Sequence, residues 1–269
     1  MPLTAQDYID LAPVDADYRY AYGDDPNQFG DLYLPPEGEK PALVILIHGG
    51  CWRAQYGLEP IGQMAADLAQ HGVSVWSIEY RRLGNGGGWP TTFEDVGAAV
   101  DYTAVLAEKH PLDLSKIVVV GHSAGGHLGL WLAARAQLKP GDLLYQANPL
   151  AIDTVISLAG VCDLETAVAR NICQESPAEL MGGSPEDVPA HYRFGSPHAF
   201  LPLGTPHIHI AGQLDAAVPF DYVEGFVKTA EAQGDQVELI PFPNAGHFEI
   251  VTPTSDEWVT VRETILASG

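Results

Sequence analysis

The feature that most constrains this chain is a serine between two glycines, at the point where a buried strand turns into a helix. The β-branched run 117–120 predicts the strand, and directly after it come Gly121, His122, Ser123, Ala124 and Gly125. A strand that turns at once into a helix leaves no room for side chains beside the turn, and the two glycines meet that need. The turn presents the serine hydroxyl at the edge of a sheet, near free N–H groups of the new helix. We therefore predict that Ser123 is a nucleophile.

A second glycine-containing turn follows the apolar run 43–47, which we expect to be a buried strand. It consists of His48, Gly49, Gly50, Cys51 and Trp52. Backbone amides can converge on a developing oxyanion only where no side chain keeps the ligand away. We expect the N–H groups of Gly50, Cys51 and Ala124 to form an oxyanion hole. His48 is interpreted as a residue that braces the loop through hydrogen bonds.

A carboxylate and a histidine follow two late predicted strands, at 208–212 and 237–242. Asp215 comes after the first strand and His247 after the second. The chain order serine, acid, histidine is that of a triad in which the histidine is the base and the acid orients its ring. We expect Asp215 and His247 to act with Ser123.

Two other carboxylates are weaker candidates for the acid. Asp221 falls where a helix starts after Pro219, a place that favours acidic residues for the helix alone. Asp163 precedes the strand after which this order places the acid.

Taken together, these motifs resemble the α/β-hydrolases of the esterase and kynurenine formamidase (arylformamidase) branch. Residues 48–52 are similar to the HGGxW form of that branch, although hormone-sensitive-lipase relatives carry a third glycine where this chain has Cys51. Residues 121–128, GHSAGGHL, resemble the formamidase GHSAGAHL, and residues 244–250, NAGHFEI, resemble its histidine segment. The resemblance spans nearly the whole chain, and it implies the α/β-hydrolase fold and a serine hydrolase mechanism.

Alternating strands and helices favour the same α/β fold, a mostly parallel, doubly wound sheet of about eight strands. The leading strands at 18–22 and 29–34 are expected to be antiparallel. Helices are predicted at 58–71, 92–110, 123–137, 220–232 and 255–267. A chain of 269 residues that is 46% apolar can form a single domain, 1–269. The Pro- and Gly-rich stretch 163–203 is the candidate cap insertion.

The net charge of −22 argues against nucleic acids and anionic membranes as partners, so we expect a small-molecule ester or formamide substrate. No apolar run approaches a membrane span, and the first twenty residues lack the features of a signal peptide. We expect no cofactor and no metal. His207 and His209 alternate on one strand, and we interpret them as a hydrogen-bonded pair rather than metal ligands.

Three cysteines, an odd number, do not suggest a disulfide scaffold, so a reducing, cytoplasmic setting is expected. They are Cys51, Cys162 and Cys173, and the last two flank a short helical stretch and could pair under oxidation.

Three aromatic residues adjoin the predicted site and are candidates for the substrate-binding wall: Trp52, Trp89 and Phe248. We interpret Trp131 and His127, on the helix after Ser123, as core residues.

The expected function is that of a serine hydrolase that cleaves small, short-chain carboxylic esters through an acyl-enzyme. Two alternatives remain open. The first is an arylformamidase that hydrolyses N-formylkynurenine by the same steps. The second is a hydrolase-fold protein that has lost catalysis and binds a small ligand or a partner.

Overall fold

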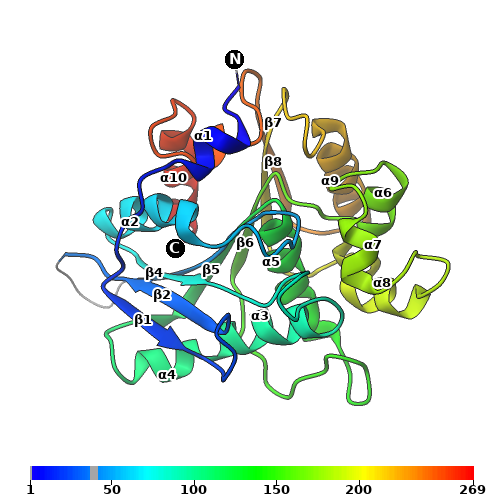
Figure 1. The fold of residues 1–269 in the computed structure, drawn as a ribbon, viewed down its shortest axis with the longest axis horizontal. Coiled ribbons are helices and arrows are strands. Elements are labelled where there is room, and N and C mark those ends of the chain that lie inside the picture. The colour runs from blue at the N-terminus through cyan, green and yellow to red at the C-terminus, as the bar shows by residue number, and fades with distance from the viewer. Residues whose placement is uncertain (1, 37–41) are drawn as a thin grey trace.

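One eight-stranded sheet organises the protein, as seen in a computed structural model that describes residues 2–36 and 42–269 (Figure 1). The strand order is β1-β2-β4-β3-β5-β6-β7-β8. β1 and β2 pair antiparallel with each other, and β2 pairs antiparallel with β4, whereas β3 to β8 form parallel pairs. The predicted α/β class and mostly parallel sheet are therefore confirmed. The strands are β1 (Tyr18–Ala21), β2 (Phe29–Tyr33), β3 (Ala42–Ile47), β4 (Ser74–Ile78), β5 (Asp113–His122), β6 (Thr154–Leu158), β7 (His207–Gly212) and β8 (Val237–Phe242).

The central strands are apolar throughout because helices cover both faces of the sheet. In β3, Leu43, Ile45 and Ile47 pack into the core on one face, and Val44 and Leu46 pack into the core on the other. The alternation follows from the two-residue period of a strand.

The first of these cores is closed by α3 (Thr91–Asp101), α4 (Thr103–Ala107), α5 (Ala124–Ala134) and α9 (Phe220–Gln233). The second is closed by α2 (Gly62–Gln70), α10 (Trp258–Ser268) and the short α1 (Ala5–Ile9), which Figure 1 shows together on one side of the sheet. Short 3₁₀ turns lie at Glu59–Ile61, Arg135–Gln137, Pro197–Phe200 and Glu249–Val251. None of the helices in the described part of the chain is long and apolar enough to cross a membrane.

The helix predicted at 92–110 is two helices, α3 and α4, which meet at Tyr102. Thr103 donates its hydroxyl proton to the carbonyl oxygen of Val100 at 2.7 Å, and such a local bond competes with the helix ladder. Helix α1 was not predicted. It is only five residues long, and a capping box between Thr4 and Asp7 starts it.

Three short helices occupy the stretch between β6 and β7: α6 (Leu164–Ala169), α7 (Ser176–Met181) and α8 (Pro189–Gly195). They lie beside α5, where the Trp131 indole N–H donates to the carbonyl oxygen of Phe194 at 2.9 Å. His127 Nε2 is likewise 2.9 Å from the carbonyl oxygen of Gly195. Trp131 and His127 are thus core residues, as the sequence predicted.

Candidate active site

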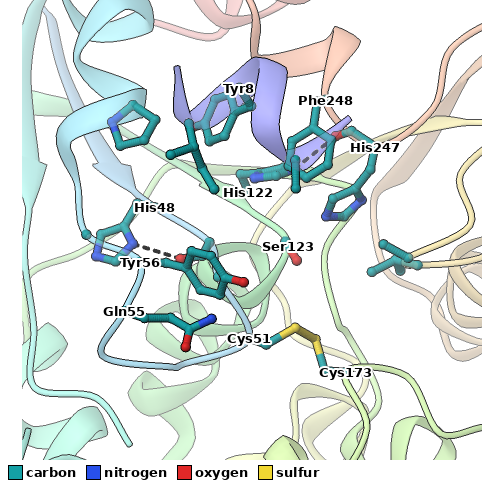
Figure 2. Close-up of a pocket in the computed structure, with 18 of the residues that line it drawn as sticks. Tyr8, His48, Cys51, Gln55, Tyr56, His122, Ser123, Cys173, His247 and Phe248 are labelled. Atoms are coloured by element: carbon teal, nitrogen blue, oxygen red, sulfur yellow. Dashed lines mark hydrogen bonds between the residues drawn. A yellow bond between two sulfur atoms is a disulfide. The ribbon is translucent and has the colours of Figure 1, made fainter. Parts of the chain in front are cut away.

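A pocket of about 330 Å³ opens at the carboxyl ends of the parallel strands, and Ser123 lies in its wall (Figure 2). This edge is where open α/β sheets bind ligands. The wall combines the loop after β3, the turn after β5, the loops after β7 and β8, and α1. Its described residues are Ala5, Tyr8, Ile9, His48, Gly49, Gly50, Cys51, Gln55, Tyr56, Gly57, Glu59, Pro60, His122, Ser123, Cys173, Ala217, Val218, His247 and Phe248.

Ser123 occupies a backbone conformation that few residues other than glycine adopt, with φ 54° and ψ −117°. Its N–H donates to the carbonyl oxygen of Leu158 in β6 at 2.9 Å, which ties the turn to the sheet. Ala124 is the first residue of α5, where backbone N–H groups have no partner within the helix. The turn therefore places the Ser123 hydroxyl in the pocket wall and the Ala124 amide directly behind it, at the start of α5.

Asp215 and His247 are joined by a hydrogen bond of 2.6 Å between Oδ2 and Nδ1. The other carboxylate oxygen accepts the N–H groups of Ala217 and Val218, each at 2.8 Å. These bonds fix the position of the carboxylate beside the ring. A proton on Nδ1 of His247 leaves Nε2 free to accept one from a hydroxyl.

The rival carboxylates lie elsewhere. Asp221 pairs with Arg170 at 3.0 Å on the surface. Asp163 caps α6 by accepting the N–H groups of Glu165 and Thr166. The structure places Asp215, and neither of these, beside the His247 ring.

The loop after β3 passes directly against Ser123. A Cβ atom on Gly49 would lie 2.8 Å from the carbonyl oxygen of His122 and 3.0 Å from Cβ of Ser123. Gly50, Cys51 and Trp52 follow with φ angles of 107°, 49° and 55°, so the backbone curls around the pocket. Gly50 and Cys51 line the pocket together with Ser123.

A buried charge network fixes this loop. His48 Nε2 is 2.9 Å from Glu79 Oε1, and Glu79 Oε2 is 3.1 Å from an Arg82 nitrogen. Arg82 also donates to the carbonyl oxygen of Tyr56, and the Tyr80 hydroxyl donates to that of His48 at 2.9 Å. Burial raises the pKa of Glu79, but His48 and Arg82 outweigh it and bring the pKa below its ordinary value.

The sequence identified His48 as a brace but missed Glu79 and Arg82. The sequence did carry a sign of this network, because both charged residues come just after β4, which is buried on both faces. Charged groups at such a place are stable only when paired.

His122, the residue before Ser123, positions the loop that carries His247. Its Nε2 is 3.0 Å from the carbonyl oxygen of His247, and the two ring centroids are 4.5 Å apart. Burial and the neighbouring His247 lower the pKa of His122, so its ring is neutral and donates from Nε2.

Cys51 and Cys173 form a disulfide, although the odd number of cysteines did not suggest one, and the alternative pairing of Cys162 with Cys173 is wrong. Cys162 is buried and free. The bridge links the loop after β3 to the segment between α6 and α7. Its partners are 122 residues apart, so spacing along the chain could not reveal it.

Two of the three aromatic residues that were predicted to form the substrate-binding wall lie outside the pocket lining. Trp52 is fully buried, with its ring edge-on to His127 on α5 at 5.2 Å, because the left-handed turn at 51–52 directs its side chain into the core. Trp89 stacks on His191 of α8 at 4.8 Å. Neither is among the described residues that line the pocket, whereas Phe248 is. The sequence missed the lining residues of α1 and the pair Gln55 and Tyr56.

His207 and His209 form a buried pair, with Nδ1 and Nε2 2.9 Å apart, as interpreted from the sequence. Within the described residues, no group of three or more His, Cys, Asp or Glu side chains is arranged to hold a metal ion.

Comparison with known families agrees with this geometry. The BD-FAE family model matches residues 30–229, which include both glycine turns, the one at Ser123 and the one at 48–52, and Asp215. The chain belongs to the BD-FAE family.

Relatives of this BD-FAE family member include esterases. Esterase LipC from Mycobacterium tuberculosis is 29% identical over 245 residues, which cover 85% of this chain and 59% of LipC. The chain spans about half to three-fifths of the length of three curated relatives that it matches.

Solved structures show the same fold. A bifunctional GH43-CE protein from Bacteroides eggerthii is 26% identical with a TM-score of 0.77, over 95% of this chain and 36% of that one. Inhibited esterase B from Lactobacillus rhamnosis has a TM-score of 0.82 at 20% identity, over 97% of this chain and 89% of that one. The α/β-hydrolase fold and the resemblance to its esterases are confirmed.

We predict that Asp215→Asn in this BD-FAE family member lowers kcat for p-nitrophenyl acetate by about 10⁴-fold, because the amide favours the wrong tautomer of His247. Asp221→Asn, the matched control, should remain within twofold of wild type, because its ion pair lies on the surface. Steady-state kinetics of both variants check the assignment. An inactive Asp221→Asn beside an active Asp215→Asn would contradict it.

We also predict that Glu79→Gln lowers kcat by about tenfold to a hundredfold with little change in KM, because a displaced oxyanion loop weakens transition-state contacts more than substrate binding. Glu224→Gln, which breaks an exposed pair with Lys228, should leave kinetics unchanged. Thermal melts of both variants separate this effect from unfolding. A folded Glu79→Gln variant with wild-type kcat would show that the network does not position the loop.

Proposed function

We propose that the protein is a serine carboxylesterase that cleaves small, short-chain esters through an acyl-enzyme intermediate. The observation that carries the proposal is the 2.6 Å bond between Asp215 and His247 in a pocket whose wall also contains the Ser123 hydroxyl. The strained turn at Ser123 adds weight, because a pocket that only binds a ligand has no need of it.

In the proposed reaction, Ser123 Oγ attacks the ester carbonyl carbon while His247 Nε2 accepts its proton. Asp215 stabilises the imidazolium that forms. The N–H groups of Ala124, Gly50 and Cys51 stabilise the negative charge on the former carbonyl oxygen. His247 returns the proton to the leaving alcohol, and water then releases the acid by the same steps in reverse.

The size of the pocket supports a small substrate. A volume of about 330 Å³ is near the lower end of the range for ligand pockets, roughly 300–1,000 Å³. The net charge of −22 disfavours anionic substrates at long range. The esterase relatives support ester cleavage, and formamide hydrolysis would use the same residues.

We expect a fluorophosphonate probe to label the wild-type protein and to fail with Ser123→Ala, because the probe reacts with an activated serine. The same variant should lose ester turnover by about 10⁴-fold or more while it keeps its fold. Ser115→Ala, at an exposed serine early in β5, is the matched control and should label normally. A folded Ser123→Ala variant that keeps a tenth of the activity would overturn the proposal.

A series of p-nitrophenyl esters tests the substrate class. We expect high kcat/KM for acetyl and butyryl esters and low values for octanoyl and palmitoyl esters, because the pocket lacks room for a long chain. N-formylkynurenine belongs in the same series. A value for it that exceeds every ester tenfold or more would favour the formamidase alternative.

A further inference from the structure

Helix α1 forms part of the pocket wall although it belongs neither to the sheet nor to the 163–203 stretch. Ala5, Tyr8 and Ile9 line the pocket. The Tyr8 ring is largely buried and stacks on Phe248, with centroids 5.4 Å apart and planes at 26°. It also lies 6.0 Å from the His122 ring. A segment near the start of the chain thus reaches the reacting centre.

The aromatic rings of Tyr8, Phe248 and His122 form a surface beside His247. Phe248 directly follows His247, with the two rings edge-on at 5.0 Å, and the His122 ring is 4.5 Å from that of His247. In Figure 2, Tyr8, Phe248 and His122 lie on one side of Ser123, whereas Gln55 and the disulfide lie on the other. The pocket therefore has two ends, and α1 lies at the end where the Phe248 and His122 rings adjoin His247.

The direction of proton transfer distinguishes these two ends. His247 must return its proton to the leaving alcohol oxygen, so the alcohol group of an ester lies against the histidine. The acyl group then points toward the opposite end. We infer that α1 is the alcohol-binding wall of this pocket and that Tyr8 determines specificity for esters of apolar, aromatic alcohols. The inference rests on the proposed esterase function.

The side chains that α1 contributes fit such an alcohol. Ala5, Tyr8 and Ile9 carry no charge, and an aromatic group can stack against or pack edge-on to the Tyr8 and Phe248 rings. Ile9 is 41% exposed at the wall, so a large alcohol would cover apolar surface that water now contacts.

A buried carboxylate couples α1 to the catalytic loop. Glu249 accepts the N–H of Leu3, just before α1, and with its other oxygen the N–H of Gly246 at 2.8 Å. Gly246 immediately precedes His247. One side chain thus sets the position of the alcohol wall relative to the base, which suits α1 to act as a fixed part of the site.

The test compares two ester series in wild type and Tyr8→Ala. One series keeps the acetyl group and varies the alcohol from methyl to 2-naphthyl, and the other keeps 2-naphthol and varies the acyl group from acetyl to butyryl. We expect the kcat/KM preference for 2-naphthyl over methyl acetate to fall about tenfold, mainly through KM, because the stacking contact is lost. The butyryl-to-acetyl ratio should stay within twofold.

Three further variants complete the design. Tyr8→Phe keeps the ring and should keep the preference. Tyr8→Leu keeps an apolar side chain and should lose the preference even if Tyr8→Ala fails to fold. Tyr18→Ala, an exposed tyrosine outside the pocket lining, should behave as wild type.

An unchanged alcohol preference in folded Tyr8→Leu, or a shift in the acyl ratio alone, would overturn the inference while leaving Ser123-dependent ester turnover intact. A wild-type protein without Ser123-dependent turnover would overturn the proposed function, and this inference with it.

Discussion

The close approach of three backbone segments around the β5–α5 turn is the constraint on which the rest of the site depends. A Cβ atom on Gly121 would lie 2.1 Å from the carbonyl oxygen of Gly125, and one on Gly125 would lie 2.1 Å from that of Ile47 at the end of β3. Contacts this short are impossible for side chains, so the turn must be glycine on both sides of Ser123. The same closeness brings the loop after β3 against Ser123, and the proposed oxyanion hole depends on it.

Buried charges then fix the loops that the sheet presents. Glu79, between His48 and Arg82, holds the loop after β3, and Asp215 holds the ring of His247 while its second oxygen binds backbone amides. Each carboxylate is stable in the interior because its oxygens are bonded. Removing a partner would leave an unpaired buried charge, so these bonds constrain the geometry of the site.

Much of the fold could be predicted because its signals are local. The apolar runs of β3 and β5 are buried on both faces, and such runs are typical of the central strands of a parallel sheet. The triad candidates could be placed because parallel strands end at one edge of the sheet. The sequence pattern missed the break between α3 and α4, beside which the Thr103 hydroxyl donates to the carbonyl oxygen of Val100. The position of Trp52 in the core depends on left-handed backbone angles that residue type does not reveal.

The sequence by itself determined the hydrolase fold, the strained serine turn and the candidate residues Ser123, Asp215 and His247, since each follows from residue types and spacing over a few positions. Only the tertiary structure decided what surrounds them. It joined Cys51 to Cys173 and placed Tyr8 against Phe248, and in each pair the partners lie more than 100 residues apart. Contacts of that kind arise when the sheet and helices pack, because packing brings together segments whose sequences carry no sign of each other.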